Sequence, residues 1–280
     1  MVQSATDIDT ETRTWAVIIA GSAGAVGRAL EQAASVSPPE RTFVVVTARR
    51  PGGLHALPSG LAHVLVEPLD RGSAASILFP VHWIHASDPE ATVVVFGDDP
   101  PCFGHQIAQA ARLAERHADS LILLGLPPGV GEPERGFIVP GERIDSTVEG
   151  PLFRVRDLID PDPEGDARPR VGAMGSGAIF AGRAKTFIGA AAEHGAALND
   201  RLARALTFAG QEHERWALRQ AYALAPRIDF FRSILRPIAR ALAVLEVQNF
   251  DRLADGGEER ALEDRAALGL RAWSTATAPG

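Results

Sequence analysis

Acidic side chains follow several apolar segments of this chain, and their positions suit ligand or metal chemistry. Asp98 and Asp99 come directly after the apolar run 91–96, and Glu67 ends the run 62–67. Where parallel strands end, carboxylates lie at the edge of the sheet at which ligands bind. Carboxylate oxygens are also ligands that Mg²⁺ prefers. Asp98 and Asp99 are therefore candidate ligand-site carboxylates, and a solvated turn or a helix cap is the alternative role.

A glycine-rich segment, 21–25, follows the first apolar run. Glycines between a strand and a helix are typical of turns that hold a phosphate at the helix N-terminus. The spacing also resembles a dinucleotide-binding turn, and Arg49 and Arg50 are placed as contacts to a 2′-phosphate would be. Short-chain dehydrogenase chemistry needs a nearby tyrosine–lysine pair, but the only tyrosine, Tyr222, lies far from the only lysine, Lys185. A phosphate-binding turn or a plain tight turn is favoured over a nicotinamide site.

Apolar runs alternate with helical segments along the chain. The runs are short and rich in β-branched residues, which predicts buried strands, and the segments between them have helical periodicity. Strands alternating with helices predict an α/β fold in which helices cover both faces of a mostly parallel sheet. The predicted strands are 15–20, 43–47, 63–66, 92–96 and 121–125, with 135–141, 152–158, 176–181 and 239–248 as a more mixed extension; the predicted helices are 27–36, 73–86, 104–118 and most of 183–225.

Composition excludes several classes of protein. The single cysteine, Cys102, rules out an intrachain disulfide, and no apolar stretch reaches the roughly 20 residues that span a bilayer. The N-terminus lacks the features of a signal peptide, so we expect a cytoplasmic protein that does not bind membranes. The net charge of −7 argues against nucleic acid as a partner. We expect a disordered tail at 1–13, one domain over 14–268 and a flexible tail at 269–280.

Three segments, 67–100, 121–142 and 152–163, carry a resemblance to a known family. Their order, within a match over about 15–268, resembles the bacterial mannose-1-phosphate guanylyltransferases. These enzymes join a sugar 1-phosphate to GTP and release pyrophosphate. The resemblance implies a Rossmann-like nucleotidyltransferase fold, which is a glycosyltransferase-A-like three-layer fold with a mostly parallel mixed central sheet. It also implies a guanine nucleotide or a nucleotide sugar as the ligand.

The resemblance assigns roles to individual residues. Asp99 stands where the family holds Mg²⁺ with the aspartate of Pro-Ser-Asp-His, and Asp255 is the best match to a second metal aspartate, with Asp251 as a competitor. Glu67 lies in the segment near the nucleotide base, where it could accept hydrogen bonds from guanine. The implied nucleotide-binding residues are Gly21, Ser22, Gly24, Glu67, Arg71 and Gly72, and the implied sugar-binding residues are Glu134, Gly136, Asp160 and Ser176.

The loop that carries catalysis in this family is missing. Family members have Gly-Gly-x-Gly-Thr-Arg and then Pro-Lys-Gln-Phe, whose backbone N–H groups and basic side chains hold the triphosphate. Here the segment 21–25 runs directly into the helical stretch 26–33. The family's Glu-Lys-Pro near the sugar phosphate is Asp160-Pro161, and Lys185 belongs to another segment. Phosphoryl transfer depends on positioning and charge stabilisation, so weak or lost transfer is expected.

Three functions stay open. The first is a degenerate nucleotidyltransferase that binds a nucleotide, a nucleotide sugar, a protein partner or a second copy of itself. The second is an active nucleotide-sugar pyrophosphorylase in which arginines replace lysine, with Arg28, Arg41, Arg49 and Arg50 as candidates. The third is an NAD(P)-binding Rossmann protein. The resemblance and the missing loop together favour the first.

Overall fold

Strands and helices alternate along the first half of the chain, as the apolar pattern predicts. The computed structural model describes residues 13–20, 23–46, 63–97, 103, 105–127, 136–147, 150–160 and 172–248. The strands are β1 (Thr14–Ala20), β2 (Thr42–Val46), β3 (His63–Val66), β4 (Thr92–Phe96), β5 (Ile122–Leu126), β6 (Phe137–Thr147), β7 (Gly150–Ile159), β8 (Met174–Arg183) and β9 (Ala243–Glu246). The helices are α1 (Ala23–Ala33), α2 (Ser73–Ser87), α3 (His105–Arg116), α4 (Ala184–His194), α5 (Ala196–Leu206) and α6 (Glu214–Leu224), with short turns η1 (Pro39–Arg41), η4 (Phe231–Leu235) and η5 (Ala239–Ala241).

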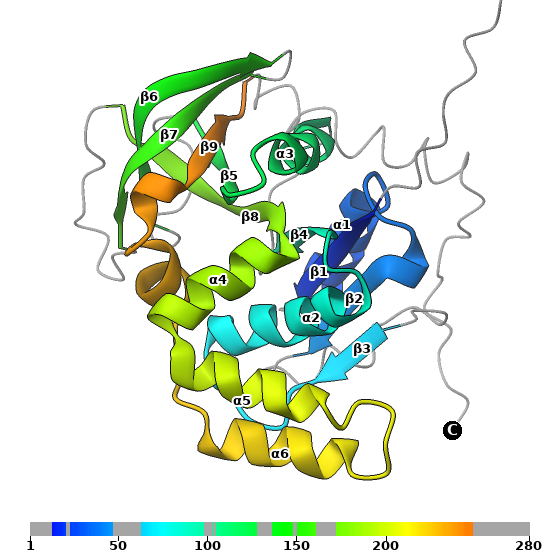
Figure 1. The fold of residues 1–280 in the computed structure, drawn as a ribbon. Helices are drawn as coiled ribbons and strands as arrows, with labels where there is room; N and C mark the ends of the chain where they lie inside the picture. Colours follow the sequence, from blue (N-terminus) through cyan, green and yellow to red (C-terminus); the bar gives the residue numbers. More distant parts are fainter. Residues whose placement is uncertain are drawn as a thin grey trace, which may run out of the picture. The chain divides into compact units, whose positions relative to one another are not determined.

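All the strands in the described residues belong to one mixed sheet, in the order β3-β2-β1-β4-β8-β5-β9-β7-β6. β1 pairs in parallel with β2 and β4, β2 with β3, and β5 with β9. β8 lies between β4 and β5 and is antiparallel to both. β6 also pairs with β8, so the last five strands of the order close into a ring (Figure 1). The predicted mostly parallel, mixed α/β sheet is confirmed.

β8 occupies the middle of the sheet rather than extending its edge, and its small residues explain how it fits there. A Cβ on Gly182 would lie 2.3 Å from Leu121 Cδ2, and one on Gly177 would lie 2.7 Å from Phe103 Cζ. The predicted strand 239–248 is shorter in the structure. Its first residues form the η5 turn, and β9 covers only Ala243–Glu246.

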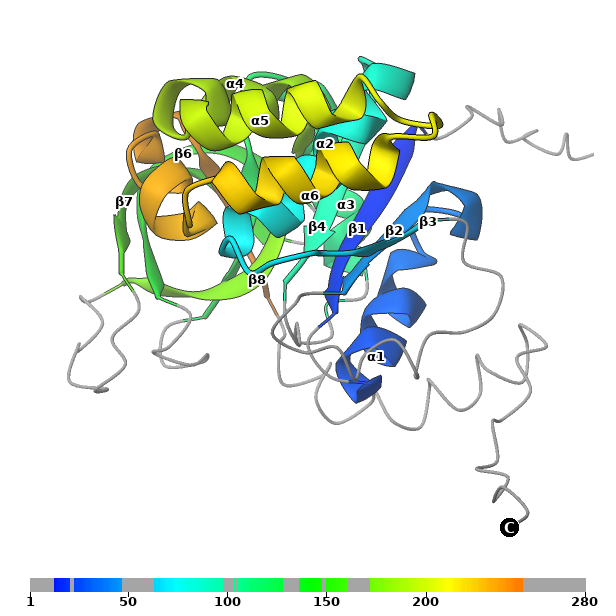
Figure 2. The same cartoon turned by 90° about the horizontal axis from the view of Figure 1, so that it is seen from below.

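Helices cover both faces of the sheet. α2 and α4 pack on one face in the main core, with α5 and α6 beyond them, whereas α1 lies on the opposite face (Figure 2). α3 contacts β4, β5 and β8. Every residue of β2, β4 and β5 is buried, which explains the continuous apolar runs in the sequence. α1 begins at Ala23, so the helix predicted over 27–36 starts four residues earlier and takes in Gly24 and Gly27.

Candidate functional site

β1 to β4 run parallel to one another, as do β5 and β9, and β8 is antiparallel to both β4 and β5. The carboxyl ends of β1 to β5 and of β9 therefore lie at one edge of the sheet, which we call the carboxyl edge. The opposite edge is called the amino edge. Glu67 directly follows β3 at the carboxyl edge, and α1 starts three residues after the end of β1. Gly97 follows β4 and donates its N–H to the carbonyl of Ala178 at 2.8 Å. The carboxyl edge is where an α/β sheet of this kind binds ligands.

Three of the expected sugar-binding residues meet where β6, β7 and β8 adjoin, and we call Gly136, Asp160 and Ser176 the β6–β8 corner. Phe137 pairs with both Ile159 and Gly175, so Gly136 lies between the other two members of the corner. The Ser176 N–H donates to the Gly136 carbonyl at 3.1 Å. These residues are 40 positions apart from first to last, and strand pairing brings them together.

The backbone at this corner departs from ordinary strand geometry. Gly136 has φ 76°, and Ala178 has φ 55°, in the left-handed region that residues with a Cβ rarely adopt. The register of β5 against β8 shifts between Leu123 and Gly125, opposite this stretch. Irregular backbone of this type redirects a strand and is frequent beside functional sites.

Glu67 is buried, and its carboxylate is bound from two helices. The hydroxyl groups of Ser76 on α2 and Tyr222 on α6 donate to Glu67 Oε1 at 2.9 and 3.2 Å. Burial raises the pKa of Glu67 to about 7, an effect that these two hydrogen bonds partly oppose and the charge of Asp70 slightly increases. Tyr222 has no exposed surface, and burial raises its pKa as well. Glu67 thus joins the end of β3 to both helices.

Arg71 and Gly72 also have structural partners. The guanidinium of Arg71 donates to the carbonyl of Tyr222 and, at 2.9 Å, to that of Ala223, so it caps the last turn of α6. Gly72 has φ 80°, and a Cβ there would lie 2.3 Å from the carbonyl oxygen of Ile228. Both residues bind the loop before α2 to the segment after α6. Nucleotide contacts by Glu67, Arg71 and Gly72 stay a prediction.

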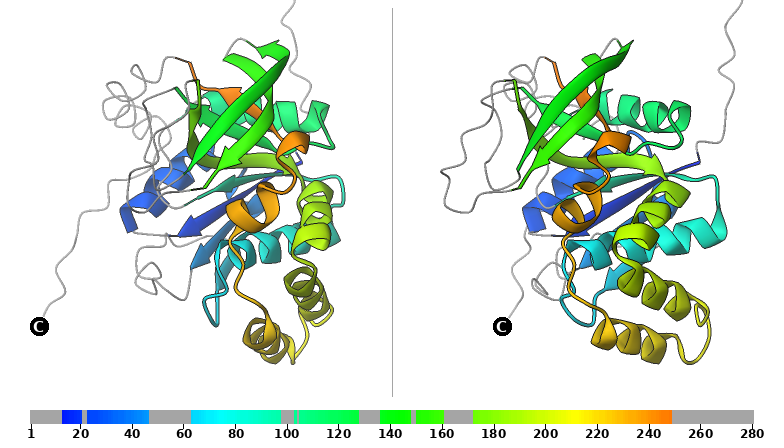
Figure 3. Two further views of the ribbon diagram at one scale, coloured as in Figure 1. Left: turned by 90° about the vertical axis from the view of Figure 1, so that its left-hand side faces the viewer. Right: turned by 60° about the vertical axis from the view of Figure 1, so that its left-hand side comes forward.

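Asp160 is the partner of two arginines that the sequence reasoning missed. Its Oδ2 atom accepts a hydrogen bond from Arg236 Nη1 and lies 3.6 Å from Arg232 Nε. Arg232 lies in the η4 turn and Arg236 directly follows it, and this turn lies beneath the β6–β7 hairpin (Figure 3). A signal was present, because arginines four residues apart lie on the same side of a helical turn. Their partner, 72 and 76 positions away, could not be read from that spacing.

The only lysine lies at the amino edge of the sheet, away from this corner. Lys185 follows β8 and pairs with Glu90, which precedes β4, at 3.7 Å. From Ser176 to Arg183, β8 extends over roughly 23 Å at the usual rise per strand residue. A lysine side chain cannot cover that distance. Arg41, one of the arginines considered as a replacement for a catalytic lysine, ends η1 directly before β2 and therefore also lies at the amino edge.

The arrangement also excludes a Tyr222–Lys185 pair, because Tyr222 donates to Glu67 while Lys185 contacts Glu90. Gly24 lies in the first turn of α1, where a phosphate would meet free backbone N–H groups. Within the ranges that the structure describes, no cluster of His, Cys, Asp and Glu has the form of a metal site. Gly21, Ser22, Glu134, Asp99, Asp255, Asp251, Arg49 and Arg50 lie outside the described residues.

Comparison with known proteins shows the fold. No family model and no curated protein matches the chain. Among solved structures it matches a mannose-1-phosphate geranyltransferase from Thermus thermophilus, with a TM-score of 0.67 and 22% identity over 84% of this chain and 74% of that one. It also matches a mannose-6-phosphate isomerase from Helicobacter pylori, with a TM-score of 0.57 and 13% identity over 84% of this chain and 97% of that one.

These matches define the fold class of the chain. It shares an α/β fold with two solved structures that are named for mannose phosphates. This agrees with the fold expected from the sequence. None of the helices in the described residues has the length and apolar character to cross a membrane.

Proposed function

We propose that this protein binds a guanine nucleotide or a GDP-sugar at the carboxyl edge, as a nucleotidyltransferase-like protein whose transferase activity is weak or lost. One observation carries the proposal: three of the four expected sugar-binding residues meet at the β6–β8 corner, while the only lysine is paired with Glu90 at the opposite edge. A ligand site without its lysines suits binding better than transfer.

The chemistry of the reaction supports this division. Phosphoryl transfer needs cationic groups placed on the phosphates as negative charge redistributes, and protein side chains supply little else. Neither Lys185 nor Arg41 can reach the corner from the amino edge. The helical start of α1, by contrast, offers backbone N–H groups to a phosphate without any lysine.

A divalent cation completes the proposed site. We extend the proposal to Mg²⁺, with Asp99 and Asp255 as its expected ligands, because carboxylate oxygens are ligands that Mg²⁺ prefers. Asp99 is two residues beyond Gly97, whose N–H is bound to Ala178 of β8. When bound, the cation would supply positive charge that offsets the negative charge of the ligand's phosphates.

Calorimetry tests the binding. GTP, GDP and GDP-mannose would be titrated into the full chain with and without Mg²⁺, alongside the Asp99→Asn variant. We expect binding that Mg²⁺ strengthens, and an Asp99→Asn protein that has lost this effect of the metal. GDP and GDP-mannose should bind at least as well as GTP, because the loop that grips the triphosphate is missing. Failure of all three ligands to bind would overturn the proposal and favour a role with a protein partner or in self-association.

A pyrophosphate-release assay tests the loss of transfer. With GTP, mannose 1-phosphate and Mg²⁺, release should be absent or very slow, although the protein is folded. Robust release that disappears in Asp99→Ala would overturn the loss of activity. It would favour the second candidate, an active pyrophosphorylase that uses arginines, for which Arg232 and Arg236 beside Asp160 are the specific observation.

A further inference from the structure

Two arginines that are four residues apart, one in the η4 turn and one directly after it, share a single carboxylate oxygen. Arg232 and Arg236 both approach Asp160 Oδ2, while Asp160 Oδ1 is buried and has no hydrogen-bond partner in the described part of the chain. One arginine would neutralise this carboxylate. The second arginine adds a positive charge, which the carboxylate of Asp229, three residues before Arg232, partly offsets.

The arginines retain donors for a ligand. Their side chains are 60% and 48% exposed, and a guanidinium carries five N–H groups, of which Asp160 occupies one or two. Two planar guanidinium groups side by side match the tetrahedral oxygens of a phosphate, which arginine binds in a bidentate manner.

The turn that carries them is held in place from the other side. Asp229 accepts the N–H of Arg232 at 2.8 Å and the hydroxyl of Ser73 at 3.0 Å, and Ser73 in turn accepts the N–H of Phe230 at 2.8 Å. The Asp229 carboxylate is therefore engaged with backbone and α2 rather than with the guanidinium groups. Asp160 and Asp229 together position the two arginines before any ligand arrives, which reduces the entropy lost on binding.

We propose that Arg232 and Arg236, positioned by Asp160, form a binding site for a phosphate monoester beside the β6–β8 corner. Asp160 lies next to Gly136 across the β6–β7 ladder, and Gly136 in turn binds Ser176, so the arginine pair adjoins the expected sugar-binding residues. The site therefore takes the phosphate end of a sugar phosphate. This inference rests on the proposed function for its location and adds the anion-binding residues.

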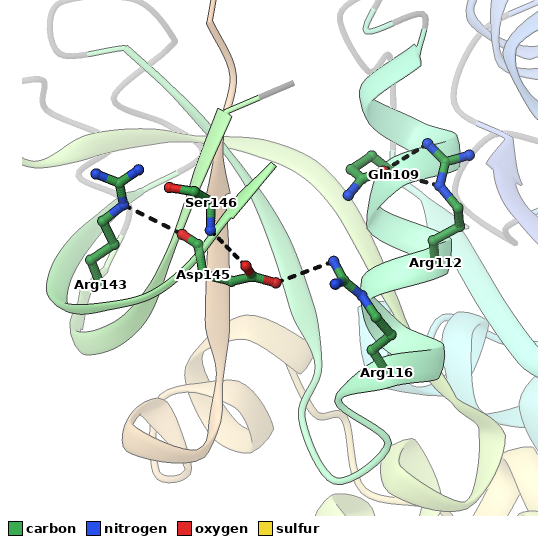
Figure 4. A network of polar contacts seen from close by, with 6 residues as sticks. All are labelled: Gln109, Arg112, Arg116, Arg143, Asp145 and Ser146. Atoms are coloured by element: carbon green, nitrogen blue, oxygen red, sulfur yellow. Dashed lines mark hydrogen bonds and ion pairs between the residues drawn. The ribbon is translucent and has the colours of Figure 1, made fainter. Parts of the chain in front are cut away.

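Phosphorus NMR titrations with inorganic phosphate and with mannose 1-phosphate test this site, using the full chain and its Arg232→Gln, Arg236→Gln and Arg236→Lys variants. Arg116→Gln is a matched control. Arg116 pairs with Asp145 at 3.2 Å between α3 and β6, with exposures of 55% and 29% that resemble those of Arg236 and Asp160 (Figure 4). It ends α3, before β5 at the amino edge. Circular dichroism would establish that each variant is folded.

We expect each glutamine substitution to weaken the binding of both phosphates roughly tenfold or more, because a charge-assisted hydrogen bond to the ligand is lost. Arg236→Lys should retain part of the affinity, and Arg116→Gln all of it. Wild-type binding in folded glutamine variants would show a merely structural ion pair and overturn the proposal, as would a wild-type chain that binds neither phosphate at millimolar concentration. GDP binding by the same proteins separates the two proposals. A chain that binds GDP but neither phosphate would refute the arginine site and leave the proposed function standing.

Discussion

Glu67→Gln is the substitution whose effect the structure specifies most closely. The carboxyl group is 4% exposed and is held by Ser76 and Tyr222, and burial raises its pKa from the ordinary value of 4.5 to about 7. At about 1.4 kcal/mol per pH unit, this difference makes ionised Glu67 cost the folded state up to about 3.5 kcal/mol relative to the neutral acid. Glutamine is neutral at every pH and still offers an oxygen to the two hydroxyl groups.

The sign of the pH dependence follows from the raised pKa. Between pH 4.5 and about 7, folded Glu67 holds its proton more tightly than unfolded Glu67 does, so the free energy of unfolding falls as pH rises through this window. The stabilisation is complete below pH 4.5 and is lost above about pH 7. Glu67→Gln should remove this contribution. The free energy of unfolding of the variant, relative to that of the wild type, should therefore increase as pH rises from 5 to 8.

Urea unfolding at pH 5, 6, 7 and 8, followed by far-ultraviolet circular dichroism, would measure the difference between the two proteins. Glu115→Gln, at an exposed position on α3, serves as the control and should track the wild type. If the difference in unfolding free energy between wild type and Glu67→Gln is the same at all four pH values, the argument from burial is wrong.

Three further substitutions have expected outcomes. Gly72→Ala should lower the free energy of unfolding by about 1–3 kcal/mol, because φ is 80° and the added Cβ would meet the Ile228 carbonyl; an unchanged urea midpoint would contradict this. Tyr222→Phe should cost about 1–3 kcal/mol, and more at pH 8 than at pH 5, because a charged Glu67 then loses one of its two donors. Lys185→Gln should leave calorimetric binding of GDP unchanged, since its ion pair lies at the amino edge; a clear loss of affinity would place the ligand elsewhere.

Local pattern was enough to predict the elements. Runs such as 92–96 have the length and β-branched composition of buried strands, and every residue of β4 is indeed buried. Helix positions followed from periodicity, with boundaries displaced by a few residues, as for α1. The same residues alone could not place β8 between β4 and β5, because strand order depends on pairings between distant segments.

Part of the candidate site could also be predicted from the sequence, whereas the rest is visible only in the folded structure. Composition by itself determined that no second lysine is available, and local pattern predicted that Glu67 stands where a strand ends. Only the tertiary structure decided that Glu67 is bound by a tyrosine 155 positions later, and that Asp160 meets an arginine 76 positions later. Side-chain periodicity is a property of consecutive residues, so it can be read from the chain. Burial and ion pairing depend on which segments the closed sheet and its helices bring together, and these contacts form only in the folded protein.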